Sequence, residues 1–141
     1  MIAAIRRAFI IDKDEFVRLS LSKMLQKYGF TVEEIEDFSQ LEGREKDIRG
    51  GIVVADVDIE VVEGRLSLLK KWSDRFILTS PLVTDELTLR LKKMGVQHII
   101  KKPVDPRILR KVIRTISFPD GVKVPSLGKK RGGSPLRSER R

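Results

Sequence analysis

The stretch that most constrains the fold runs from Gly51 to Asp58, with the sequence GIVVADVD. Residues 52–55 are apolar without alternation and follow two glycines. An unbroken apolar run of this length is typical of a strand buried on both faces, as in parallel sheets covered by helices. The run ends on a carboxylate, Asp56, and open parallel α/β sheets bind ligands beyond the carboxyl ends of their strands. We therefore expect Asp56 to lie at a functional edge of the sheet.

The rest of the chain alternates short apolar runs with segments of helical periodicity. This order predicts an α/β fold, a (βα)5 doubly wound five-stranded parallel sheet with helices on both faces. Asp14 is a suitable N-cap for the first helix, and Asp105 with the following proline starts the last one. The expected strands are 8–11, 31–35, 52–55, 76–78 and 98–100, and the expected helices are 14–28, 39–46, 64–72, 84–94 and 106–116.

Composition narrows the class of protein. The chain of 141 residues fits one domain, which we place at 1–118, followed by a basic tail at 119–141 whose Gly, Pro, Ser, Lys and Arg content predicts disorder. The absence of cysteine excludes disulfides, thiolate zinc sites and cysteine nucleophiles, and a single histidine argues against a serine-type triad. No apolar run approaches the roughly 20 residues of a membrane span, and the first residues do not resemble a secretory signal, so we expect a cytoplasmic protein.

Polar side chains end four of the five expected strands, namely Asp12, Asp56, Thr79 and Lys102. Each residue alone is equally compatible with a helix cap, a turn or a solvated surface position. Because parallel strands end at one edge of the sheet, the four side chains are expected to converge. A carboxylate nucleophile, a hydroxyl, an ammonium and a cation bound by oxygen atoms suit phosphoryl transfer.

In this order and spacing the chain resembles the receiver domains of bacterial response regulators, the phosphoacceptor half of two-component signalling, over residues 6–117. Residues 56–64 align without a gap with the family segment Asp-x-x-Met-Pro-Gly-x-Asp-Gly. Residues 94–103 resemble the segment Gly-Ala-x-x-Tyr-x-x-Lys-Pro. The resemblance implies a flavodoxin-like receiver fold and a signalling module rather than an enzyme.

The resemblance assigns roles at the phosphoryl site. Asp56 would accept phosphate from a sensor histidine kinase or a phosphotransfer protein and form an aspartyl phosphate. Thr79 would hydrogen-bond a phosphoryl oxygen, and Lys102 would form an ion pair with it. The peptide bond before Pro103 is cis in many relatives, which would direct Lys102 at the site.

The resemblance also implies a Mg²⁺ site made by Asp12, the Asp56 carboxylate and the backbone carbonyl of Asp58. The family usually has two adjacent acids after the first strand, and here the second is Lys13. An ammonium at this position opposes a dication, so the atypical pocket either substitutes Lys13 for part of the metal charge or recruits Asp14 as a replacement ligand.

Other departures concern the switch. Ile99 replaces the aromatic residue that commonly reports phosphorylation on the last strand. The Met-Pro-Gly loop is replaced by residues 59–61, where Glu60 adds a negative charge close to Asp56, and Pro81 stiffens the loop after Thr79. The main alternative is therefore a pseudo-receiver, a phosphorylation-independent protein-interaction module with the same fold.

Residues 84–116 form the surface on which a switch would act, towards a downstream protein target or in self-association. Its basic residues suit an acidic protein partner, and a solvated face is the plainer interpretation of any one of them.

The tail offers weak, non-specific nucleic acid or anionic lipid contacts as a further alternative to a linker. An Asp-nucleophile phosphatase would use the Asp56 and Asp58 pair, but the chain is short and has no cap domain. The basic residues expected on the surface formed by residues 84–116 are Arg90, Lys92, Lys93, Arg107, Arg110, Lys111 and Arg114.

Overall fold

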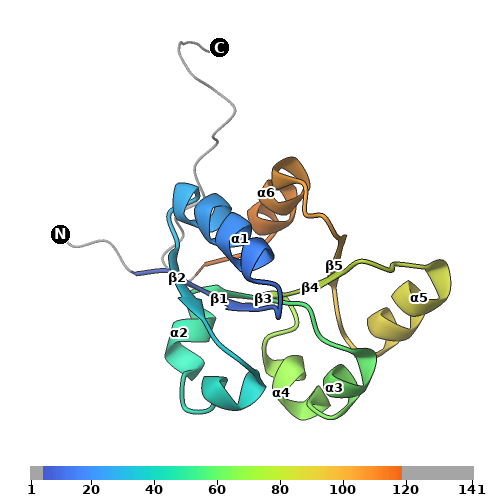
Figure 1. The fold of residues 1–141 in the computed structure, drawn as a ribbon. Helices are drawn as coiled ribbons and strands as arrows, with labels where there is room; N and C mark the ends of the chain where they lie inside the picture. The colour runs from blue at the N-terminus through green and yellow to red at the C-terminus, as the bar shows by residue number, and fades with distance from the viewer. Residues whose placement is uncertain (1–4, 119–141) are drawn as a thin grey trace, which may run out of the picture.

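Five parallel strands form one sheet in the order β2-β1-β3-β4-β5. The computed structural model describes residues 5–118 (Figure 1). The architecture confirms the predicted α/β parallel sheet. The elements are β1 (Arg7–Ile11), α1 (Glu15–Lys27), β2 (Thr31–Glu34), the 3-10 helix η1 (Phe38–Leu41), α2 (Glu45–Arg49), β3 (Ile52–Ala55), α3 (Ile59–Glu63), α4 (Leu66–Lys71), β4 (Phe76–Ser80), α5 (Asp85–Lys93), β5 (His98–Lys101) and α6 (Pro106–Arg114).

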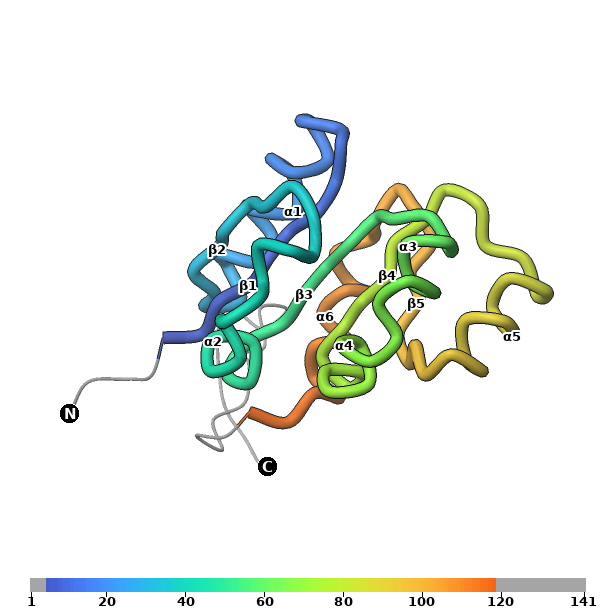
Figure 2. Tube along the Cα trace, turned by 90° about the horizontal axis from the view of Figure 1, so that it is seen from below, coloured from blue at the N-terminus to red at the C-terminus, as the bar shows by residue number. Residues whose placement is uncertain are grey.

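Helices cover both faces of the sheet. Alternate residues of a strand point to opposite faces, so Ala8 and Ile10 of β1 join the core under α1 and α6, whereas Phe9 joins the core under α2, α3, α4 and α5. Figure 2 shows α1 beside β1 and β2, with α5 beyond β5 at the other edge of the sheet. Each of the four residues of β3 is buried, because this strand is central and both of its faces are covered.

Gly51 fixes the entry into β3. A Cβ atom at this position would lie 1.9 Å from the carbonyl oxygen of Arg7, whereas at Gly50 the nearest atom would be 3.8 Å away. The Gly51 carbonyl accepts a 2.7 Å hydrogen bond from Nη1 of the buried Arg75, which also donates to the carbonyl of Ser117. The backbones of β1 and β3 therefore approach closely at the amino end of β3, opposite the end that carries Asp56.

Two of the predicted helices are wrong in extent. The helix expected at 64–72 is the shorter α4, and a separate helix that was not predicted, α3, precedes it and ends at its C-cap Gly64. The helix expected at 39–46 is η1 followed by α2, separated at Gly43, whose φ of +79° favours glycine.

Helix α1 begins at the predicted cap. The Asp14 carboxylate accepts hydrogen bonds from the backbone amides of Phe16 and Val17, so Asp14 closes the first turn of the helix. Leu21 and Leu25 face the core, but Phe16 is 81% exposed. Phe16 has the spacing of the core residues but stays at the surface in the first turn of α1.

No helix in the described range 5–118 is long and apolar enough to cross a membrane. The expectation of a disordered basic tail at 119–141, with its suggested contact to nucleic acid or lipid, lies outside the described residues.

Candidate functional site

The register of the sheet brings Asp12 and Asp56 together. Ile11 of β1 pairs with Ala55 of β3, and the Asp56 amide continues the ladder by donating to the Ile11 carbonyl at 2.8 Å. The two aspartates are the next residues along each strand, so both leave the sheet at the same edge. Asp12 and Asp56 are far apart in the sequence, and the pairing of β1 with β3 is what brings them together.

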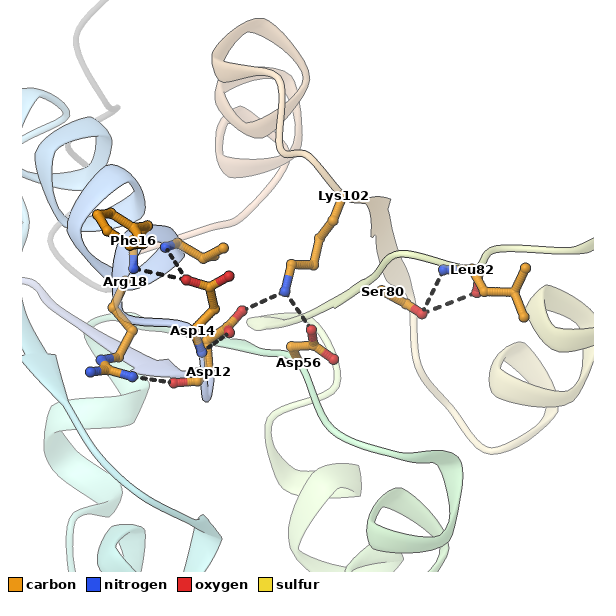
Figure 3. A network of polar contacts seen from close by, with 9 residues as sticks. Asp12, Asp14, Phe16, Arg18, Asp56, Ser80, Leu82 and Lys102 are labelled. Atoms are coloured by element: carbon orange, nitrogen blue, oxygen red, sulfur yellow. Dashed lines mark hydrogen bonds and ion pairs between the residues drawn. The ribbon is translucent and has the colours of Figure 1, made fainter.

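Lys102 reaches this edge from β5. Its amide donates to the Ser80 carbonyl at 2.8 Å, which extends the pairing of β5 with β4 by one residue. The Lys102–Pro103 peptide bond is cis. The side chain of Lys102 then crosses the end of β4 towards the two aspartates (Figure 3).

One ammonium joins the two carboxylates. Nζ of Lys102 lies 2.8 Å from Oδ2 of Asp12 and 2.5 Å from Oδ2 of Asp56. The Asp12 side chain is 3% exposed, that of Lys102 14% and that of Asp56 27%. Asp56 is thus the member of the trio that solvent or a ligand reaches most readily.

The cationic form of Lys102 is favoured in this setting. Partial burial acts to lower the pKa of the Lys102 amine, but hydrogen bonds and charge attraction from Asp12 and Asp56 outweigh it and hold the pKa above its ordinary value. Lys102 therefore carries a full positive charge between the two carboxylates at neutral pH.

Asp12 has its second oxygen occupied as well. Its Oδ1 accepts a 2.8 Å hydrogen bond from the Asp14 amide, so both carboxylate oxygens have donors. The Asp12 carbonyl accepts a 2.8 Å hydrogen bond from Nη1 of Arg18, whose Nε bonds Glu34 at 2.8 Å. Arg18 was missed by the sequence analysis, because nothing in its helical spacing shows that it turns back onto the end of β1.

Thr79 is present at the same end of β4, where it pairs with Ile100 of β5. The residue is 1% exposed, and its Oγ1 has no hydrogen-bond partner within residues 5–118. A buried hydroxyl without a partner costs free energy, so such a group is a candidate for a ligand contact. Ile99, the expected switch position, lies on β5 opposite Leu78 and is half-buried.

A hollow of about 670 Å³ opens beside the aspartates, between the carboxyl ends of β1, β2 and β3. Asp12 and Asp56 line it together with Lys13 and Asp58. Lys13 is exposed, and none of the described residues forms an ion pair with it. The structure therefore places this second ammonium at the mouth of the same site.

The donors present do not fit a Mg²⁺ site. Mg²⁺ takes near-octahedral oxygen ligands, usually one or two carboxylates with waters. Both oxygens of Asp12 are already hydrogen-bonded, and the Asp14 carboxylate is engaged at the start of α1. Across residues 5–118 no group of three or more His, Cys, Asp or Glu side chains lies close enough to hold a metal ion.

The chain belongs to the response regulator receiver domain family, whose model matches residues 8–114. This finding confirms the resemblance drawn from the strand-end residues. Members of the family are signalling modules that interact with histidine kinases or phosphotransfer proteins and with downstream targets, and they typically bind Mg²⁺. No curated protein matches the chain.

Several solved structures share the fold. The chemotaxis protein CheY4 of Vibrio cholerae has a TM-score of 0.63 at 20% identity, over 80% of this chain and 99% of its own. A putative pilus assembly-related protein from Burkholderia pseudomallei has a TM-score of 0.62 at 15% identity, over 79% and 88% of the two chains. The beryllofluoride-activated receiver domain dimer of NtrC4 has a TM-score of 0.60 at 21% identity, over 75% and 92%. These identities show a common fold.

Proposed function

We propose that the protein is a phosphoacceptor response regulator in which Asp56 accepts a phosphoryl group from a histidine kinase or phosphotransfer protein in the cytoplasm. The observation that carries the proposal is the contact of Lys102 Nζ with Asp56 Oδ2 at 2.5 Å, made to the most exposed member of the trio. An oxygen that faces solvent beside a fixed cation is suited to attack phosphorus.

The phosphoryl transfer itself is a single displacement at phosphorus. An Asp56 oxygen attacks the phosphorus, the new P–O bond forms as the P–N bond of the donor phosphohistidine breaks, and the imidazole leaves with a proton from solvent. Lys102 lies where it can neutralise charge on the transferring oxygens, and the unpartnered hydroxyl of Thr79 is available to donate to one of them.

The output surface that we propose comprises α5, β5 and α6. These elements come after Thr79 in the chain, and Lys102 directly follows β5. Phosphorylation of Asp56 would draw Lys102 away from Asp12 and so shift the loops at the ends of β4 and β5. Arg110 departs from the expected exposed set, since it is half-buried near Tyr28, whose pKa is raised by burial in spite of the opposing Arg110 charge. The basic residues that remain exposed and suit an acidic partner are Arg90, Lys92, Lys93, Arg107, Lys111 and Arg114.

A pseudo-receiver is the second candidate function. The observation that favours it is Lys13 at the mouth of the hollow, where an ammonium replaces a carboxylate. In that case the same surface would bind a partner without phosphorylation, and the Lys102 ion pairs would serve only to hold the ends of β1, β3 and β5 together.

Intact-mass spectrometry after incubation with acetyl phosphate tests the choice. We expect one added phosphoryl group on the wild type and none on Asp56→Asn, while the matched control Asp58→Asn retains labelling. Absence of labelling in every condition, together with failure to bind beryllofluoride, would favour the interaction module.

A further inference from the structure

We infer that this pocket does not take up Mg²⁺, and that Lys102 and Lys13 supply the positive charge for a phosphoryl group at Asp56. The first half of the inference stands on the geometry of the free protein. The second half rests on the proposed phosphoacceptor function.

Three of the four carboxylate oxygens of Asp12 and Asp56 already have hydrogen-bond donors. Asp12 offers both of its oxygens to donors of the chain, Asp14 N–H and Lys102 Nζ, and Asp56 offers one to the same ammonium. A cation that displaced Lys102 would have to break two ion pairs at 2.8 and 2.5 Å. Mg²⁺ also releases its own waters reluctantly, so it gains little from such an exchange.

The charge balance points in the same direction. Two carboxylates and the Lys102 ammonium leave one net negative charge at the end of β1 and β3. Lys13 adds a positive charge next to Asp58, so the three aspartates and two lysines at the ends of β1, β3 and β5 sum to one net negative charge, while Arg18, Glu34, Glu36 and Asp37 line the β2 side of the hollow. A dication is attracted weakly to such a site, whereas a site with three carboxylates would attract it strongly.

No other acid of the loop replaces the missing ligand. Asp14 follows Lys13 directly, but its Oδ1 accepts from the amides of Phe16 and Val17 at 2.9 and 3.4 Å. This cap holds the Asp14 carboxylate at the first turn of α1, one residue beyond the position that Lys13 occupies. The sequence analysis left Asp14 open as a replacement ligand, and the helix cap is the use that the structure gives it.

The ammonium group of Lys13 lies on the side of Asp56 where an attached phosphoryl group would project into the hollow. It lines the hollow onto which the exposed part of Asp56 opens, while Lys102 approaches from the β5 side. A phosphoryl group on Asp56 would therefore lie between two ammonium groups from different elements. This arrangement neutralises its charge without a divalent ion.

A Mg²⁺ titration followed by amide NMR shifts tests the first half. We expect wild-type protein to show no saturable shifts at the Asp12, Asp56 and Asp58 amides. Lys13→Asp, which exchanges the ammonium for a carboxylate in the hollow, should gain saturable binding, with affinity higher by about tenfold or more. Lys13→Ala, which removes the charge without adding a ligand, should gain less.

The dispersion of the same spectra shows that each variant is folded, and Lys13→Glu provides a second carboxylate variant. Saturable wild-type binding as tight as that of Lys13→Asp would overturn the inference. Equal, weak binding in all variants would overturn it too, because it would show that Lys13 does not control the site.

Acetyl phosphate labelling with Mg²⁺ or with EDTA tests the second half. We expect equal labelling of wild type in both conditions and reduced labelling of Lys13→Ala in EDTA. Labelling that requires Mg²⁺ would overturn the inference and keep the proposed function. No labelling of wild type in either condition would overturn the proposed function, and the Mg²⁺ titration would still decide the first half.

Discussion

Lys102 and Asp56, which directly follow β5 and β3, contact each other at 2.5 Å although 46 positions separate them in the chain. The same ammonium contacts Asp12 at 2.8 Å. The three side chains therefore form one charge cluster in which two acids depend on a single cation. The stability of this edge of the sheet consequently depends on one lysine.

Replacement of Lys102 by methionine should destabilise the fold. The substitution leaves the Asp12 carboxylate, 3% exposed, beside Asp56 with no cation between them. We expect the free energy of unfolding to fall by about 2–3 kcal/mol, below the cost of breaking a fully buried pair because Asp56 is partly solvated. Urea denaturation measures it. The matched control Lys101→Met, on the exposed neighbour, should change stability by less than about 0.5 kcal/mol. Equal effects of the two variants would contradict the prediction.

Thr79→Val should raise stability and lower phosphorylation. Valine has nearly the same shape, suits a strand and removes a buried hydroxyl that has no partner within the described residues. We expect a gain of about 1 kcal/mol in thermal or urea unfolding, with a smaller labelled fraction after acetyl phosphate treatment. Thr79→Ser keeps the hydroxyl and should retain labelling. A loss of stability in Thr79→Val would show instead that the hydroxyl is satisfied.

Gly51→Ala should be severely destabilising because its Cβ atom would lie 1.9 Å from the backbone oxygen of Arg7. The β1–β3 pairing would have to shift, and we expect a loss of about 3 kcal/mol or more. Gly50→Ala is the matched control, since its nearest neighbour is 3.8 Å away. Comparison of the two midpoints in urea checks the prediction, which fails if both variants unfold alike.

His98 should make stability depend on pH. Burial lowers the pKa of its imidazole, and this outweighs the contact with the Asp74 carbonyl, which acts to raise it. As the pH falls below about 6.5, His98 therefore becomes protonated in the unfolded chain before it does so in the folded protein. The free energy of unfolding decreases over this range, until the pH passes the pKa of His98 in the folded protein. Stability from this source is complete above the unfolded pKa and lost on acidification.

Urea midpoints measured between about pH 7.5 and 5 will show this decline. His98→Gln, which carries no titratable group, should flatten the profile in the same range. His98 is the single histidine of the chain, so its own NMR titration gives the folded pKa directly. A wild-type profile as flat as that of the variant would contradict the assignment.

The sheet and the position of its polar edge were predictable because the signals are local. Unbroken apolar runs end on Asp12 and Asp56, and parallel pairing alone brings such residues to one edge. The resemblance to receiver domains added the expected partners of Asp56. The ion pairs of Lys102 were not predictable in detail, because they depend on side-chain directions set by the pairing of β4 with β5 and by the turn at Pro103.

The helices were predicted less well, for a physical reason. The helical period of Leu66, Leu69 and Trp72 does not show where the helix begins, and the short helix α3 before it was not predicted. Phe16 likewise has core spacing but lies at the solvent side of α1. Periodicity gives the face of a helix, whereas its ends depend on caps and on contacts with the sheet.

The order of the strands along the chain bears on how the protein is made. Asp12 and Asp56 become neighbours as soon as β1 pairs with β3, but the cation that joins them belongs to the last strand. A nascent chain that ends before Lys102 holds two like charges at the edge of an incomplete sheet. The arrival of β5 therefore completes the sheet and brings in the cation that offsets that repulsion.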